Sequence, residues 1–140
     1  MRQKSRTFPG VFESLPKIRN FVVKAAKKAG FGEADVYAVE LAVDEACSNI
    51  IEHAYGGEGI GDINCTCQIT DKDLTFVIRD RGRPFEPDSI PEPDFSVPLD
   101  QLKSGGAGLF LMRKMMDDVR FEFTQDQGNT LTLVKHRNAK

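Results

Sequence analysis

One stretch decides how this chain is expected to fold: Glu45-Ala46-Cys47-Ser48-Asn49, followed one turn later by His53. It lies in a longer segment, from about Glu33 to Ala54, in which apolar residues recur every three or four positions. That spacing predicts a helix with one buried face. Because Glu45 and Asn49 are four residues apart, their side chains are neighbours on another face of the same helix.

Three further short signals follow this stretch in order. They are Asp80-Arg81-Gly82-Arg83-Pro84-Phe85 after an expected strand, Gly105-Gly106-Ala107-Gly108-Leu109 before an expected helix, and finally Gly128-Asn129-Thr130. An acid and an amide on one helix face, an aspartate closing a strand and a glycine loop opening a helix can together hold a nucleoside triphosphate and its metal. The order of the four signals therefore predicts an ATP site within one small domain.

Periodicity along the rest of the chain predicts an α+β fold. Further helices are expected at about 14–29, with Ser14 as the N-cap, and at about 108–117. Strands are expected at about 6–12, 63–69, 74–78, 119–123 and 131–133. This order predicts a two-layer α/β sandwich, with helices packed on one face of a mixed, mostly antiparallel sheet. A long proline-rich loop fills residues 83–104, and such loops in compact domains are usually functional.

Composition limits the classes of function. The 140 residues are expected to form a single domain covering 1–140. A net charge of −2 argues against wholesale binding of nucleic acid or anionic lipid. The apolar runs are far shorter than a membrane span and no signal-peptide pattern precedes Phe8, so a cytoplasmic location is expected. Cys47, Cys65 and Cys67 fit no zinc spacing and are expected to be small core residues in a reducing compartment.

Glu45 and Asn49 are the first candidate site residues. A neutral oxygen such as that of Asn49 suits Mg²⁺, which binds through few protein groups and substrate phosphates. Glu45 beside it could accept a proton from a hydroxyl or water that attacks the γ-phosphate. Taken alone, the pair has a simpler explanation as part of a solvated helix face. His53 is expected to be structural rather than catalytic.

Asp80 and the glycines are candidates for holding the base and the phosphates. An aspartate at a strand end can accept a hydrogen bond from an exocyclic amine such as adenine N6, although Asp80-x-Gly82 alone is also a common turn. Gly106 and Gly108 precede an apolar helix, where backbone N–H groups and the helix N-terminus favour phosphate oxygens. A flexible loop shares that pattern. Lys103 is either a phosphate contact or a solvated lysine.

Other nucleotide-binding folds lack their motifs in this chain. There is no P-loop sequence G-x-x-x-x-G-K-[ST], and neither H-R-D nor D-F-G of the protein-kinase fold occurs. The glycines do not follow the first strand, as they would in a Rossmann fold.

With its four signals in this order, the chain resembles the GHKL superfamily of histidine-kinase-like ATPases, which have the Bergerat fold. Glu45 and Asn49 match the N box of that superfamily. The other motifs correspond in order: Asp80-x-Gly82-x-Pro84-Phe85 to the first G box, Gly106-x-Gly108-Leu109 to the second, and Gly128-Asn129-Thr130 to the late Gly/Thr element. The resemblance covers roughly residues 6–136.

Within the superfamily, the stretch from Val43 to Tyr55 closely resembles the signature of anti-sigma factor serine/threonine protein kinases of bacterial partner-switching systems. The resemblance implies a protein that binds Mg²⁺-ATP and phosphorylates a serine or threonine of a small antagonist protein. It implies that the protein alternatively holds a sigma factor inactive. The implied partners are therefore the sigma factor, the antagonist and a second copy in a homodimer, with no direct contact to nucleic acid or membrane.

The same resemblance implies roles for single residues. Glu45 corresponds to the general base and Asn49 to the Mg²⁺ ligand. Nucleotide contacts are implied for the other motif residues: Asp80, Gly82 and Thr130 at the adenine, Gly106 and Gly108 at the phosphates, and Leu109 as a further nucleotide-binding residue. The loop at about 86–104 corresponds to the ATP lid. Arg19 falls where the first helix of the family often carries an arginine that faces partners.

Two alternatives stay open. The chain could be a partner-switching kinase whose target is not a sigma factor, which would share the same ATP site. It could also be a module that binds ATP or a partner without phosphoryl transfer, although an intact Glu45 argues against this.

Overall fold

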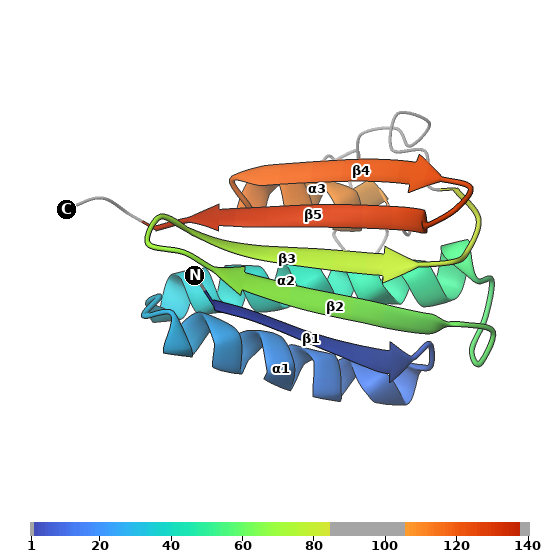
Figure 1. Cartoon of the computed structure of the whole chain (residues 1–140), viewed down its shortest axis with the longest axis horizontal. Coiled ribbons are helices and arrows are strands. Elements are labelled where there is room, and N and C mark those ends of the chain that lie inside the picture. Colours follow the sequence, from blue (N-terminus) through green and yellow to red (C-terminus); the bar gives the residue numbers. More distant parts are fainter. Residues whose placement is uncertain (1, 85–105, 138–140) are drawn as a thin grey trace.

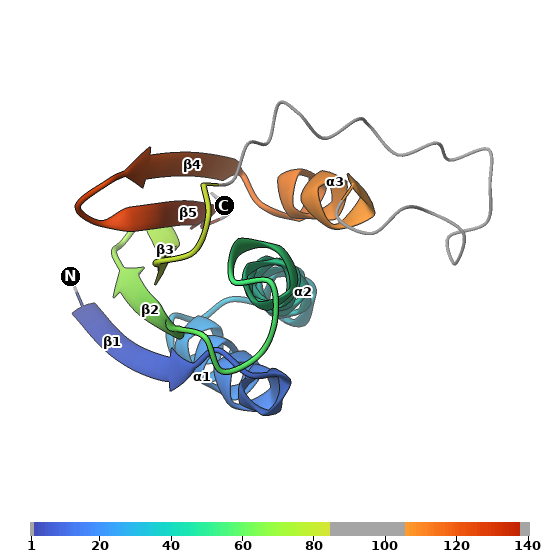
Figure 2. The ribbon, with the colours of Figure 1, turned by 90° about the vertical axis from the view of Figure 1, so that its right-hand side faces the viewer.

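Helices cover one face of a five-stranded sheet in the computed structural model, which describes residues 2–84 and 106–137 (Figures 1 and 2). The elements in chain order are β1 (Arg2–Pro9), α1 (Leu15–Lys28), α2 (Glu33–Asn49), β2 (Asp62–Ile69), β3 (Asp73–Asp80), α3 (Gly106–Met115), β4 (Asp118–Thr124) and β5 (Gly128–His136). The arrangement confirms the expected α+β sandwich. None of the described helices is long and apolar enough to cross a membrane.

The strands lie in the order β1-β2-β3-β5-β4, and every pairing among the described strands is antiparallel. The sheet is thus antiparallel throughout its described part, where a mixed, mostly antiparallel sheet was expected. The central ladder joins β3 to β5, from Asp73 opposite His136 at one end to Asp80 opposite Asn129 at the other. Polar residues therefore face one another at both ends of this ladder.

Alternation along β3 builds the core. Leu74, Phe76 and Ile78 are fully buried and belong to the sheet face that the helices cover. They pack with the apolar stripes of α1 and α2, whose buried members include Ile18, Val22, Val39 and Val43. The apolar faces predicted from strand alternation and from helical spacing thus pack against each other in one layer.

Cys47, Cys65 and Cys67 are free thiols within this core. Burial raises the pKa of Cys65 to about 12 and that of Cys67 to about 11. Burial also raises the pKa of Cys47 well above its ordinary value. The thiols are therefore protonated at neutral pH and pack as small apolar side chains, as the sequence predicts.

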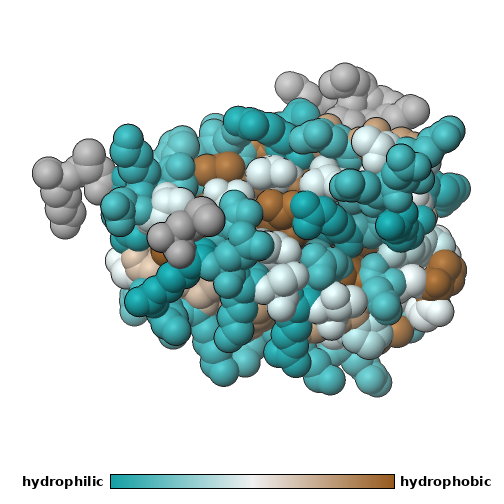
Figure 3. Space-filling model, in the orientation of Figure 1, coloured by the Kyte–Doolittle hydropathy of each residue, from teal (hydrophilic) through white to brown (hydrophobic). Residues whose placement is uncertain are grey.

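The opposite face of the sheet is open and mainly polar. Figure 3 shows it in teal and white, with scattered brown patches. On β1 and β2 this face carries hydroxyl and amide groups that bond across the strands. Asn64 Nδ2 donates to Thr7 Oγ1 (2.9 Å), and Thr66 Oγ1 donates to Ser5 Oγ (3.0 Å). The sheet thus has one apolar and one polar face, as in other antiparallel sheets with helices on one side.

The start of the chain differs from the sequence prediction. The first strand covers Arg2–Pro9 rather than 6–12, and a short 3₁₀ turn at Phe12–Ser14 leads into α1. Ser14 precedes α1, but its hydroxyl donates to the carbonyl of Pro9 (2.7 Å) and does not cap the helix. The hydroxyl links the end of β1 to the start of α1 instead.

The second helix also changes form near its end. The predicted length, to Ala54, is confirmed, but the last turn at Ile50–Ala54 is a π-helix, labelled η2. The N–H of Tyr55 accordingly donates to the carbonyl of Ile50, five residues back (2.9 Å). Such wide turns often occur at functional sites. Here the turn ends beside the segment that follows β3.

Candidate nucleotide site

The first turn of α3 lies directly against the Glu45–Asn49 face of α2. A Cβ added to Gly108 would lie 2.5 Å from Oε2 of Glu45 and 3.7 Å from Nδ2 of Asn49. The first of these distances is far inside van der Waals contact, so any larger residue at position 108 would displace the Glu45 carboxylate. The fold therefore brings together two motifs that are separated by about sixty residues in the sequence.

Glu45 is partly buried in this contact. Burial raises the pKa of its carboxyl above the ordinary value, and the negative charges of Asp44 and Glu52 raise it further. Asp44 in turn forms an ion pair with Arg19 of α1 (2.7 Å), the arginine expected to face partners. A glutamate with a raised pKa is a stronger proton acceptor than an ordinary one, which suits a general base.

Asp80, at the end of β3, is buried on the same side of the sheet as the helices and is only 5% exposed. Its Oδ1 accepts hydrogen bonds from the Gly82 N–H (2.8 Å) and from Asn129 Nδ2 (2.9 Å). Burial raises the pKa of the Asp80 carboxyl, and these two hydrogen bonds oppose that rise. No hydrogen bond from the described residues reaches Oδ2. The carboxylate therefore keeps one oxygen available as an acceptor for a ligand.

Gly82 fixes the end of β3 against the end of η2. A Cβ on Gly82 would lie 2.5 Å from the carbonyl carbon and oxygen of Ala54. The next residue, Arg83, donates its backbone N–H to the Ala54 carbonyl (2.8 Å) and its guanidinium Nη2 to the His53 carbonyl (2.8 Å). The imidazole of His53 itself is exposed, 3.8 Å from the Glu52 carboxylate. His53 thus contributes its backbone to this contact, and among the described residues its ring does not line the pocket.

A pocket opens between these elements on the helix side of the sheet, with about 460 Å³ of empty space including its open mouth. Its walls are mostly apolar, and the polar residues on its border include Asp80 and Asn129, whose side chains are held by hydrogen bonds. The lining residues are Ala46, Asn49, Ile50, Ala54, Asp80, Met112, Phe121, Glu122, Asn129, Thr130 and Leu131. An apolar slot with a few convergent polar groups is typical of a small-molecule site. Asp80 and Asn49, two of the predicted site residues, both line it.

The residues present fit a flat heterocycle and a metal-bound phosphate tail. The apolar walls can cover a ring, and Asp80 Oδ2 can accept from an exocyclic amine. No group of three or more His, Cys, Asp or Glu side chains in 2–84 and 106–137 could hold a metal by itself. Asn49 would therefore need phosphate oxygens to complete the coordination of Mg²⁺, which commonly binds in this way.

The other predicted residues occupy different positions. Gly106 is the first residue of α3, and Leu109 is buried (4% exposed) where that helix packs on the core. Thr130 lines the pocket, but its partner in the ladder is Arg79, the residue just before Asp80. Strand alternation therefore directs its side chain to the open face of the sheet. The predicted lid at 86–104, with Lys103, lies outside the described residues, as does Phe85.

Asn129 is the site residue that the sequence reasoning missed. It lies directly opposite Asp80 in the β3–β5 ladder, and its amide donates to the Asp80 carboxylate. The signal was present in the sequence as a polar residue at an inward position of the last strand, among Leu131 and Leu133. Recognising it required the register between two strands that are far apart in the sequence.

Comparisons with known proteins point to one family of ATPases. The family model of the histidine kinase-like ATPase domain matches residues 8–135. The chain is 33% identical over 133 residues to the serine-protein kinase RsbW of Halalkalibacterium halodurans, covering 92% of this chain and 80% of that protein. It is 30% identical over 132 residues to the serine-protein kinase RsbW of Bacillus thuringiensis, covering 91% and 81%.

A solved structure shares the fold. It contains the RsbU and RsbW domains of Rv1364c from Mycobacterium tuberculosis and superimposes with a TM-score of 0.70 at 17% identity. The likeness covers 100% of the present chain and 34% of that longer chain. At this identity the comparison shows the fold alone.

Proposed function

Because the chain belongs to the histidine kinase-like ATPase family and is a serine-protein kinase of the RsbW type, we propose that it phosphorylates a serine of a small antagonist protein. In the alternative state it holds a sigma factor inactive. The observation that carries the proposal is the contact of Gly108 with Glu45 and Asn49 beside the pocket that Asp80 borders. This contact supports a single site for the base, the phosphates and the attacking hydroxyl.

Each residue has a role in this proposal. Asp80 Oδ2 accepts a hydrogen bond from the adenine amine, while the apolar walls cover the ring. The backbone at Gly106 and Gly108 approaches the phosphate oxygens, since the N-terminus of α3 favours anions. Asn49 would hold Mg²⁺ together with the phosphates, and the bound ion would neutralise phosphate charge.

Glu45 then acts as the general base. The serine hydroxyl oxygen bonds to the γ-phosphorus, and the bond from that phosphorus to the β,γ-bridging oxygen breaks, which releases ADP. Glu45 takes the hydroxyl proton as this happens. The raised pKa of its carboxyl supports this role, because a base is most effective when its pKa approaches the working pH.

The partners follow from the same proposal. They are a sigma factor, the antagonist that carries the target serine, and a second copy of the chain in a homodimer. The resemblance to RsbW kinases supports the sigma factor and the antagonist. The homodimer is proposed from the wider family resemblance alone. Since sigma factors and ATP both occur in the cytoplasm, we place the protein there.

The test is phosphate transfer to a purified candidate antagonist, chosen from the genes adjacent to that of the kinase. With Mg²⁺ and γ-labelled ATP, we expect label on one serine, identified by mass spectrometry. Changing that serine to alanine should abolish labelling, and so should Glu45→Ala in the kinase. Glu33→Gln is the matched control, because Glu33 is an exposed glutamate in the first turn of the same helix and does not line the pocket. ATP binding without transfer to any adjacent antagonist or sigma-associated protein would instead indicate a binding module.

A further inference from the structure

We propose that Asn129 is a positioning residue that makes the site select 6-amino purines over 6-keto purines, by fixing which oxygen of Asp80 faces the ligand. The inference rests on the proposed nucleotide-binding function and names the residue that determines its specificity. It concerns adenine against guanine, whose six-positions carry an amine and a carbonyl respectively.

The contacts of Asn129 define its orientation. Its Nδ2 donates to Asp80 Oδ1 (2.9 Å) and to the Arg83 carbonyl (2.7 Å), with a longer contact to the Gly82 carbonyl (3.4 Å). All three neighbours are acceptors, so the NH₂ end of the amide must face them. The two amide protons are therefore used to connect the carboxylate of Asp80 to the backbone of the segment that follows β3.

Burial makes the loss of the Asn129–Asp80 hydrogen bond costly. Asn129 is 8% exposed and Asp80 is 5% exposed, so neither side chain can exchange its partner for bulk water. The ladder register places the two residues directly opposite each other. A buried carboxylate that lost its donor would be left with an unsatisfied oxygen, which costs more than an exposed one.

The fixed orientation explains a preference between bases. Oδ1 accepts from both Gly82 and Asn129, which leaves Oδ2 as the acceptor toward the pocket. An amine at the six-position of a purine donates to that oxygen. A carbonyl at the same position would place acceptor against acceptor in a buried site, and sites built around one hydrogen bond reject ligands that cannot make it.

Without the amide of Asn129, two restraints disappear together. The Asp80 carboxyl could rotate, and burial would favour its neutral form, which can donate to a carbonyl as well as accept from an amine. Adenine and guanine would then be treated more alike. The expected signature is a change in the ratio of two affinities, beyond any general weakening of binding.

The experiment measures ADP and GDP binding by calorimetric titration, which needs no protein substrate. Asn129→Leu keeps a similar size and removes both donors, and Asn129→Ala serves if leucine prevents folding. We expect ADP affinity to fall about 10-fold or more and the ADP-to-GDP preference to shrink by a similar factor, the size expected for a hydrogen bond to a charged group. Asn129→Thr restores one donor and should recover most of the preference.

The outcomes distinguish a failure of the role of Asn129 from a failure of the proposed nucleotide-binding function. A folded Asn129→Leu or Asn129→Ala variant that keeps the wild-type ADP-to-GDP ratio would show that Asn129 is only structural, and the inference would be wrong. Failure of Asn129→Thr to recover any preference would also count against it. If the wild-type chain bound neither ADP nor ATP, the proposed function itself would fail, and the inference with it. Thermal unfolding of each variant confirms that the compared proteins are folded.

Discussion

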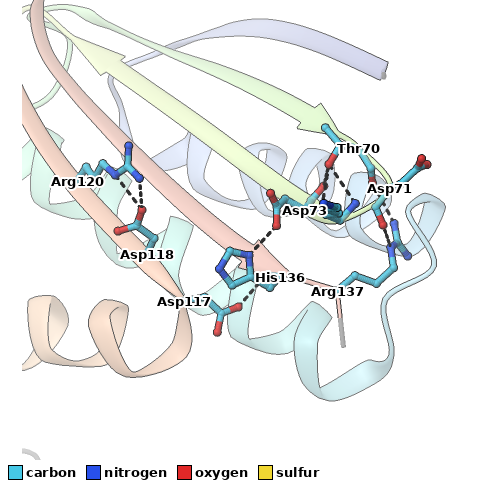
Figure 4. A network of polar contacts seen from close by, with 9 residues as sticks. Thr70, Asp71, Asp73, Asp117, Asp118, Arg120, His136 and Arg137 are labelled. Carbon is cyan, nitrogen blue, oxygen red and sulfur yellow. Dashed lines mark hydrogen bonds and ion pairs between the residues drawn. The ribbon is translucent and has the colours of Figure 1, made fainter. Parts of the chain in front are cut away.

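The two ends of the β3–β5 ladder pair an aspartate with a polar residue in the same register, yet they have different properties. Asp80 and Asn129 lie on the helix side and are buried. Asp73 and His136 lie at the other end on the open face, where Asp73 Oδ1 is 2.6 Å from Nδ1 of His136 (Figure 4). The histidine side chain there is 59% exposed. Similar cross-strand pairs thus give a fixed acceptor where water is excluded and a titratable surface contact where it is not.

The far end also differs in what surrounds it. Asp117 accepts from the backbone N–H of His136 (2.6 Å), and Arg137 donates through Nε to the Asp71 carbonyl (3.1 Å) (Figure 4). Arg137 Nη1 also donates to the carbonyl of Ala29, at the end of α1 (2.5 Å). This network fastens the end of the last strand to a turn and a helix, so we expect it to serve the fold rather than the chemistry.

The largest expected effect tests whether the chemistry is confined to the buried end. Glu45→Ala should reduce phosphoryl transfer by about 10²- to 10⁴-fold, the usual contribution of a positioned general base. ATP affinity should change little, because Glu45 does not line the base pocket. Single-turnover transfer and nucleotide titration measure the two effects. Asp73→Ala is the control from the far end of the ladder. Near-wild-type transfer by Glu45→Ala would show that Glu45 is not the general base and that the chemistry is not confined to the buried end.

The next effect compares the two aspartates directly. Asp80→Asn should weaken ATP binding about 10- to 100-fold, because the adenine amine would face a neutral side-chain amide instead of a carboxylate. Asp73→Asn should leave ATP affinity unchanged. Isothermal titration of both variants gives the comparison, and equal affinities for Asp80→Asn and the wild type would exclude the adenine contact.

Asp80→Asn should also leave stability equal or higher at neutral pH. The pKa of Asp80 is raised in the folded state, so the folded chain holds the proton more tightly than the unfolded chain does. Its contribution to the free energy of unfolding therefore falls as pH rises from the ordinary value of 3.8 through the raised one. Above that range the ionised carboxylate is a cost that asparagine removes. Thermal unfolding at pH 7 checks this, and a clear loss of stability would contradict it.

A smaller effect tests how closely the buried end is packed. In Gly108→Ala, the new Cβ meets the Glu45 carboxylate, which can swing aside because it is the end of a flexible side chain. We expect about a 10-fold loss of transfer with a stability cost at the low end of about 1–3 kcal/mol. In Gly128→Ala the Cβ meets the backbone oxygen of Asp80 and φ is +76°, so stability should fall more. The reverse order of stabilities would contradict this packing.

The smallest effect belongs to the exposed end. The Asp73 carboxylate raises the pKa of His136 above its ordinary value of 6.5. A histidine with a raised pKa stabilises the fold fully below its unfolded pKa, and this contribution is lost as pH rises through the folded pKa. The thermal unfolding midpoint should thus decrease slightly as the pH is raised above 6.5. His136→Gln should remove that pH dependence. ATP affinity should be unaffected in the same range, and a change in it would link the two ends.

Much of the molecule could be predicted from local pattern. The helices, the alternating strands and the burial of Cys65 and Cys67 follow from periodicity, which depends on neighbouring residues alone. The shared helix face of Glu45 and Asn49 could be predicted because four-residue spacing on a helix needs no tertiary knowledge. Asn129 and the outward side chain of Thr130 were not found, because they depend on the register between β3 and β5. The Ser14 hydroxyl bonds to Pro9 for a similar reason, since the fold supplied an acceptor that the capping pattern did not anticipate.

The buried thiols also make the chain convenient for spectroscopic labelling. Maleimides and most oxidants react with thiolate, and a thiol with a pKa near 11 or 12 is ionised only to roughly one part in ten thousand or less at neutral pH. All three cysteines of the sequence lie in the core, where reagents have little access. A single cysteine introduced at an exposed position such as Tyr37 or Ile60 should therefore be labelled selectively in the folded protein, without first replacing the native cysteines.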